Sequence, residues 1–198
     1  DSALEDKYCE NLYELVYHSN RQIAQAAGEF LNEKLFIKVE NPPSEFKRGK
    51  KQTENSTFIQ LLCQFLIESE LHDHPAYLVD AMWDIHPMLK DWECMTDLLL
   101  EDPLDPNDVM DDTHERYLVE IMTCCIKQAA TGEYPIARRQ TNRKLNAKET
   151  KQVNDDRVEL TQHFITTLPL LLTKYIADAE KLVNLLQIPQ YFDLNQYT

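Results

Sequence analysis

The amino-acid sequence predicts an all-helical protein built from antiparallel helix pairs. Only three glycines occur among the 198 residues, whereas soluble proteins average about 7% glycine and sheet proteins depend on it for tight turns. Apolar residues recur at helical spacing through most of the chain, and no segment shows the alternation typical of a strand. Residues suited to helix caps precede these apolar runs, so the helix boundaries can be predicted as well.

The first two helices are marked by their caps. Ser2 and Glu5 form a capping box, which predicts a helix over about residues 3–18. Asn20 is suited to cap the second helix. Gly28 lies inside that helix and predicts the close approach of a neighbouring helix, since glycine otherwise weakens a helix. The apolar stripe expected to be buried is Ile23, Ala26, Ala27, Phe30 and Leu31.

Prolines and acidic residues mark the helices in the middle of the chain. A third helix is predicted over about residues 56–70, because apolar residues cover much of its circumference. Pro75 and Pro87 suit the first turn of a fourth and a fifth helix. The sixth is predicted over about residues 112–131, after an acidic, proline-containing stretch at 101–112.

The last two helices complete a single predicted segment. Asn146 and Glu149 form a capping box for a long seventh helix, and Asp178 is suited to cap an eighth. Helix pairs of about 40 residues are the unit of HEAT-like α-solenoids. We therefore expect residues 1–198 to be one segment of a longer solenoid, with loops at 38–55 and 132–145. An irregular helical bundle is the alternative, because no clean internal repeat is visible.

Charge is segregated along the chain. The net charge of −14 argues against a dedicated nucleic-acid binder. Half of the basic residues nevertheless gather in two loop regions that contain one acid, Glu149. A basic loop on an acidic body can still contact phosphates, although such loops are also common as plain solvated surface. The cations are Lys47, Arg48, Lys50 and Lys51 in the first region, and Arg138, Arg139, Arg143, Lys144, Lys148 and Lys151 in the second.

Five stretches of the sequence are similar to one known family. They are Glu68–Asp84, Leu89–Met95, Ala26–Leu31, Asp178–Lys181 and Pro189–Leu194. Together they resemble the stromalin (SA/STAG) subunits of cohesin, in the family's order and spacing over essentially the whole chain. The resemblance places the chain just C-terminal to the stromalin conservative domain, so the docking function of that domain is not assigned to it.

The resemblance implies a function and a set of partners. It implies a non-enzymatic HEAT scaffold that binds the kleisin subunit, other cohesin subunits and the loader in sister-chromatid cohesion. It also implies a nuclear, chromosomal protein that contacts DNA non-specifically. The DNA-contact candidates are Lys47, Arg48, Lys50, Lys51, Arg138, Arg139, Arg143 and Lys144.

Two tryptophans are expected to differ in exposure. Trp83 shares a predicted helix face with apolar residues and is expected in the core. Trp92 stands among Lys90, Asp91 and Glu93, so we expect it to be partly exposed. An exposed tryptophan is a candidate partner contact.

No chemistry beyond binding is predicted. The stretch at 101–112 lacks the glycine and the final glutamate of a calcium loop. His72 and His74 have no third ligand nearby, so no metal site and no cofactor are expected. The five cysteines lie in apolar runs and are expected to be reduced and buried. No segment is apolar enough to predict a membrane span.

Three functions remain open at this point. The leading hypothesis is the scaffold described above. A helical-repeat carrier or adaptor that binds basic protein segments has the same architecture and also suits an acidic body. An enzyme would require a cryptic cluster of titratable groups in a buried cleft.

Overall fold

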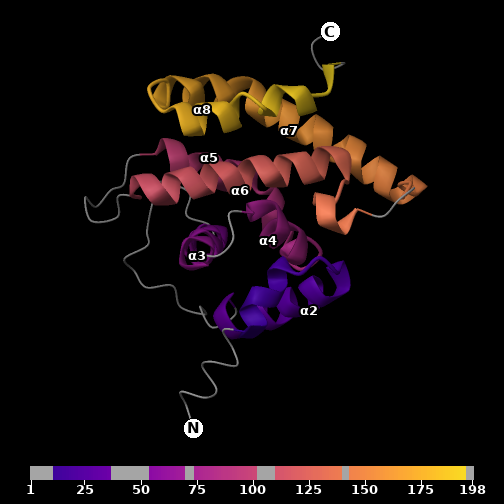
Figure 1. Cartoon of the computed structure of the whole chain (residues 1–198). Helices are drawn as coiled ribbons and strands as arrows, with labels where there is room; N and C mark the ends of the chain where they lie inside the picture. The colour runs from indigo at the N-terminus through magenta and orange to yellow at the C-terminus, as the bar shows by residue number, and fades with distance from the viewer. Residues whose placement is uncertain (1–10, 37–53, 70–73, 102–109, 140–142, 195–198) are drawn as a thin grey trace.

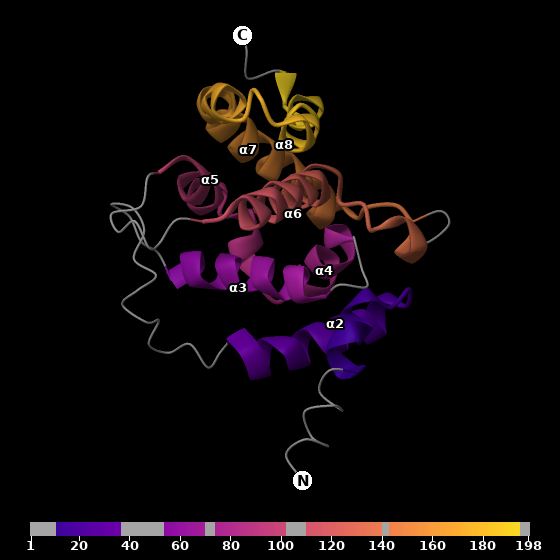
Figure 2. The same ribbon diagram turned by 60° about the vertical axis from the view of Figure 1, so that its left-hand side comes forward.

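The computed structural model of the chain is a stack of helices (Figure 1). It describes residues 11–36, 54–69, 74–101, 110–139 and 143–194. Within these ranges every regular element is helical and no strand is present, which confirms the predicted fold class. The helices follow one another from α2 through α3 and α4, then α5 and α6, to α7 and α8. Figure 2 shows the same order from another side.

Besides the α-helical residues 11–14, seven α-helices make up the described stack. They are α2 (Arg21–Leu31), α3 (Glu54–Glu68), α4 (Pro75–Met82), α5 (Trp92–Leu100), α6 (Asp112–Thr131), α7 (Ala147–Lys174) and α8 (Ala179–Leu185). A π-helix at Asn32–Phe36 continues α2, and short 3-10 helices occupy Leu15–Tyr17, Pro87–Lys90, Ile136–Arg138 and Ile188–Tyr191. The predicted starts of α2, α4, α6, α7 and α8 agree with these bounds within one residue.

Helix α2 packs against α4 through a face that differs from the predicted one. The Asn20 side chain caps α2, as expected, by accepting from the backbone N–H groups of Gln22 and Ile23. A Cβ atom added to Gly28 would lie 2.6 Å from the carbonyl oxygen of Ala81 on α4, so the glycine permits the close approach that the sequence predicted. The residues that are buried are Ala24, Ala27, Gly28 and Leu31.

Two residues of the predicted α2 stripe are therefore on the wrong side. Ile23 is 40% exposed and Ala26 is also exposed. The buried face turns toward small residues because the α4 backbone lies against it, and a larger side chain at the contact would hold the two helices apart.

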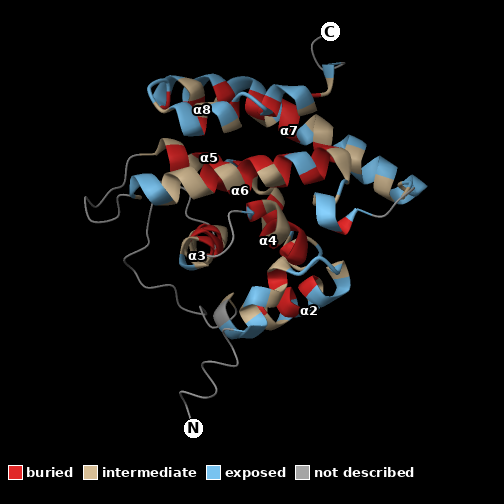
Figure 3. Ribbon diagram, viewed as in Figure 1, coloured by how far each residue is buried: buried red, intermediate tan, exposed pale blue. Residues whose placement is uncertain are grey.

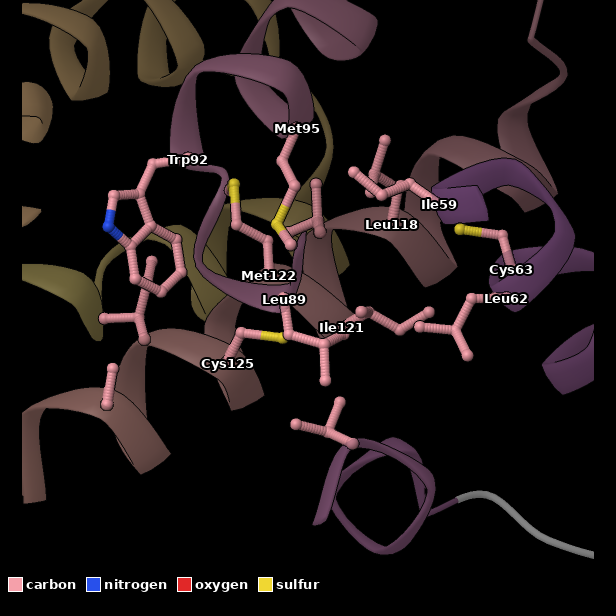
Figure 4. Close-up of a cluster of buried hydrophobic side chains, with 14 of the residues drawn as sticks. Ile59, Leu62, Cys63, Leu89, Trp92, Met95, Leu118, Ile121, Met122 and Cys125 are labelled. Carbon is pink, nitrogen blue, oxygen red and sulfur yellow. The ribbon is translucent and has the colours of Figure 1, made fainter. Parts of the chain in front are cut away.

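Helix α6 forms the centre of the stack. It packs against α3 and α4 on one side and against α7 and α8 on the other. Figure 3 shows its buried residues along most of its length. Figure 4 shows the core that results, in which side chains of α6 meet those of α3, α5 and Leu89. The α6 residues in that core are Leu118, Ile121, Met122 and Cys125, as the sequence predicted, and all four are fully buried.

Helix α7 is the longest element and begins well outside the core. Asn146 and Glu149 form the predicted capping box, with Glu149 N–H donating to Asn146 Oδ1 at 2.9 Å and Asn146 N–H donating to Glu149 Oε2 at 2.8 Å. The first buried residue of the helix is Asp156, nine residues after its start. Figure 1 shows this first part of α7 extending past α6. The capping box therefore stabilises a helix end that has few tertiary contacts.

Several predicted features differ from the structure or fall outside the residues that it describes. The predicted fifth helix at Pro87 is only a 3-10 turn, and α5 begins at Trp92 with Asp91 as its cap. Of the predicted first helix, residues 11–14 are α-helical and a 3-10 turn follows. Residues 1–10, most of the 38–55 loop and most of the acidic stretch at 101–112 lie outside the described residues.

Candidate functional site

The second basic region starts at a turn that only glycine fits. Gly132 ends α6 in the left-handed conformation, with φ of 63°, and its N–H donates to the carbonyl of Gln128 at 2.8 Å. A Cβ atom there would also approach Leu145 to 2.9 Å. Glycine is the usual residue at this cap position because it carries no Cβ penalty. The turn directs the chain away from α6 and along the start of α7.

Arg138 is an internal anchor of this region rather than a surface cation. Its guanidinium donates to Asp80 Oδ2 at 3.0 Å and to the carbonyls of Tyr77 at 2.8 Å and His18 at 3.0 Å. It also donates to the carbonyl of Val16, and its side chain is completely buried. The prediction that Arg138 contacts DNA is therefore wrong, because its donors are occupied inside the protein.

Asp80 is the centre of this buried polar cluster. Its carboxylate is fully buried on α4 and also accepts from Arg21 Nε at 3.1 Å and from Gln128 Nε2 at 2.9 Å. Burial lowers the pKa of Arg138, and the hydrogen bond and charge of Asp80 act in the opposite direction. A buried charge is tolerated only when it is paired in this way. The cluster thus ties α2, α4, α6 and the Ile136–Arg138 turn together.

Arg143 and Arg139 lie nearer the surface but are both paired. Arg143 donates to Glu149 Oε1 at 2.9 Å and to the carbonyl of Gly132 at 2.8 Å, and its guanidinium stacks on the Tyr134 ring at 4.0 Å. Arg139 is exposed and forms an ion pair with Glu133 at 2.6 Å. Both arginines are thus partly neutralised, and Arg139 is the more exposed of the two.

Three lysines near the start of α7 have no such partners. Lys144, Lys148 and Lys151 are exposed and form no ion pair or hydrogen bond within the described residues. Positive charge near a helix N-terminus is disfavoured by the helix dipole, so internal stability does not account for their position. We use the name basic edge for Arg139, Lys144 and Lys151. The other DNA-contact candidates, Lys47, Arg48, Lys50 and Lys51, lie outside the described residues.

The order of solvent exposure of the two tryptophans is the reverse of the predicted one. Trp92 is only 5% exposed and packs against Phe164 of α7, with ring centroids 6.4 Å apart. It was misassigned because the polar residues beside it point elsewhere: Asp91 caps α5, and Lys90 pairs with Asp156 of α7. Trp83, predicted to be core, does pack against the core but is only half-buried. Trp92 is therefore not a partner contact.

The described residues contain no constellation for metal or covalent chemistry. No group of three metal-ligating side chains is found among them, while His72 lies outside the described ranges. Burial raises the pKa of the Cys63 and Cys124 thiols to about 12 and raises that of Cys125 as well, so these described cysteines are not activated. Within the same ranges no helix has both the length and the apolar character needed to cross a membrane.

The fold and these surfaces define a class of protein. A stack of helix pairs presents continuous surfaces for long partners, and the polar features of the described residues are buried anchors and exposed cations. The chain therefore has the architecture of a helical-repeat protein.

Comparison with known proteins identifies the family. Residues 77–198 match the family described as "Cohesin subunit SCC3/SA, HEAT-repeats domain". The chain is 50% identical to cohesin subunit SA-1 of Xenopus laevis over 201 residues and 46% identical to cohesin subunit SA-3 of Homo sapiens over 204 residues. Both alignments cover the whole chain. Sister-chromatid cohesion protein 3 of Arabidopsis thaliana is 24% identical over 191 residues, or 94% of the chain.

The chain belongs to the cohesin SCC3/SA family. The predicted resemblance, the HEAT-type fold and the non-enzymatic class are confirmed by these matches. The chain spans 16% of the length of SA-1 and of SA-3, so the activities of the whole subunit are not thereby assigned to this segment.

Proposed function

We propose that the chain is a scaffold segment that binds the kleisin subunit of cohesin and supports non-specific DNA association in sister-chromatid cohesion. Its other partners in this proposal are the remaining cohesin subunits and the loader, and its location is the nucleus, on chromosomes. Family membership supports the general role. The finer claim, DNA contact, rests on the basic edge.

The basic edge supports DNA contact because its two lysines form no ion pair or hydrogen bond within the described residues. The chain as a whole carries a net charge of −14, so a randomly placed surface lysine would find acids nearby. Lys144 and Lys151 instead remain unpaired among the described residues, and the Arg139 side chain is exposed. The Arg138 anchor holds the end of the Ile136–Arg138 turn to the body, next to Arg139. A partner with phosphates along its backbone suits such exposed cations.

Binding of this kind is expected to be independent of DNA sequence. Contacts to phosphates fix position but carry no sequence information. Each neutralised phosphate releases counterions and steepens the dependence of the binding constant on salt, by about 0.9 in the logarithmic slope.

The test measures duplex binding by fluorescence anisotropy at several salt concentrations. The double variant Lys144→Glu/Lys151→Glu should weaken binding equally for unrelated sequences and lower the salt slope by about 2. The variant with Lys47, Arg48, Lys50 and Lys51 changed to glutamate tests the first basic region in the same way. Lys127→Glu is the matched control, because Lys127 is exposed on α6 and lies outside both basic regions. Unchanged binding in both test variants would remove DNA contact from the proposal.

A further inference from the structure

An open groove lies between the segment that follows α4 and helix α7, and it is separate from the basic edge. Its volume is about 670 Å³. One wall is the end of α4 with the Pro87–Lys90 turn, and the other is the first four turns of α7. The end of α6 and Tyr134 also line it, whereas Arg139, Lys144 and Lys151 do not. The groove is long enough to follow one face of α7 from Lys148 to Glu159.

The groove contains an accessible tryptophan. Trp83 lines the wall formed by α4 and is only half-buried, in contrast to the buried Trp92. The ammonium group of Lys90 lies 5.4 Å from the centre of the Trp83 ring. Val153 supplies apolar surface from the α7 wall. Tryptophan is the residue most enriched at the energetic centres of protein interfaces, so a partner side chain that covered Trp83 would remove substantial apolar surface from water.

Most charges that line the groove already neutralise one another. Lys148 and Glu159 are the exceptions, since both are exposed and neither forms an ion pair or hydrogen bond within the described residues. The paired groups are Arg21 with Asp84 at 3.1 Å, Arg143 with Glu149 at 2.9 Å, and Lys90 with Asp156 at 2.5 Å.

The two unpaired charges define the length of a ligand. Eleven residues separate Lys148 from Glu159, which is close to three helical turns, so both lie on the same face of α7 about 17 Å apart. An extended peptide covers that distance with about five residues. Lys90 contacts both Trp83 and Asp156, and Asp156 lies between the two charges on α7. The Trp83 ring therefore lies near Asp156 of the α7 wall, and Asp156 is closer along the helix to Glu159 than to Lys148.

We propose that this groove binds an extended peptide segment of a protein partner. The segment carries an acidic and a basic side chain about five residues apart, with an apolar side chain between them. The acid pairs with Lys148, the base with Glu159, and the apolar side chain covers Trp83. A nucleic acid fits less well, because Glu159 and the exposed Asp84 would lie against its phosphates. The inference rests on the proposed scaffold function, since it names a surface on which such a scaffold holds an extended partner.

The test uses ten-residue peptides and tryptophan fluorescence. The probe peptide has an aspartate and a lysine five positions apart around a central leucine, and it is titrated to millimolar concentration into the 198-residue chain. The expected result is a saturable change in emission that disappears in Trp83→Phe, because the buried Trp92 does not sense the groove. The proposal is overturned if the peptide causes no change in tryptophan emission, or if Trp83→Phe shows the same change as the unaltered chain.

Charge exchange tests the orientation of the proposed pairs. Lys148→Glu should favour a peptide with lysine at both positions, and Glu159→Lys should favour one with aspartate at both. Each exchange should alter affinity roughly two- to fivefold, as expected for a solvent-accessible ion pair. Lys151→Glu and Asp155→Lys are matched controls, since both residues are exposed on the same helix but do not line the groove. The proposal would be contradicted if the control variants shifted the peptide preference as much as Lys148→Glu and Glu159→Lys do.

The outcome is separable from that of the proposed function. Glu159→Lys leaves the basic edge intact, so it should not weaken DNA binding even if it alters peptide preference. If the probe peptides bind as described but DNA and kleisin do not, the groove stands and the proposed function fails. If kleisin and DNA bind while the peptides do not, only the groove proposal fails.

Discussion

The buried pair of Arg138 and Asp80 allows the sharpest prediction about how the stack is held together. In Arg138→Ala, Asp80 keeps Arg21 and Gln128, but the carbonyls of Val16, His18 and Tyr77 lose the hydrogen bonds that the guanidinium donates. Removing one partner of a buried ion pair typically costs about 3–5 kcal/mol, mostly because the other charge is left buried. We expect a loss in the lower half of that range, because Asp80 retains a second cation.

The assay is urea and thermal unfolding followed by circular dichroism. For a chain of this size each kcal/mol corresponds to about 2–4 °C in Tm, so the predicted fall is roughly 6–16 °C. Arg138→Lys should recover only part of it, since a lysine cannot supply the several donors of a guanidinium. Arg139→Ala is the matched control, because its ion pair with Glu133 is exposed and such pairs contribute about 0–1 kcal/mol.

A double variant measures the coupling between Arg138 and Asp80 apart from the effect of each single substitution. The loss of unfolding free energy in Arg138→Ala/Asp80→Asn should be smaller than the sum of the losses in the two single variants. The double variant removes both charges, so it does not leave one of them buried without the other. An Arg138→Ala protein as stable as Arg139→Ala would refute the view that Arg138 is an anchor, and strictly additive single variants would refute the coupling.

Two further predictions concern packing and pH. Gly28→Ala should destabilise the chain by about 1–3 kcal/mol in urea unfolding, because the new Cβ meets the Ala81 backbone. Helix propensity alone predicts that alanine stabilises the helix. A stabilised variant would therefore contradict the close contact. Burial lowers the pKa of His86 and of His163, where the Asp91 and Glu93 charges oppose it. The unfolded chain then binds protons that the folded chain does not, so the free energy of unfolding should fall below about pH 6.5, by at most about 1.4 kcal/mol per pH unit for each histidine. Unfolding at pH 7.5 and 5.5 checks this, with His86→Gln and His163→Gln expected to flatten the difference; equal stability at both values would contradict it.

The features that the sequence predicted correctly are local ones. The caps Asn20, Asn146 and Asp178 act on backbone groups two or three residues away, so residue type and spacing were sufficient. The same holds for the Pro75 start of α4 and for the apolar stripe of α6, which any arrangement of neighbours would bury.

The features that were missed depend on contacts between distant segments. Arg138 reaches Val16, which is 122 residues away, and nothing in its own neighbourhood distinguishes it from Arg139. One signal was present: Asp80 lies in an otherwise apolar run, and a buried acid requires a cation. The sequence did not indicate which cation. The groove was missed for the same reason, since Trp83 and Lys148 come from elements far apart in the chain.

Binding to kleisin tests the central claim most directly. The 198-residue chain should be immobilised and probed with overlapping kleisin segments and with unrelated basic peptides of equal charge. The account predicts saturable binding to at least one kleisin segment and none to the basic peptides. A folded chain that ignores every kleisin segment but binds the basic peptides would contradict the account and favour a carrier of basic cargo.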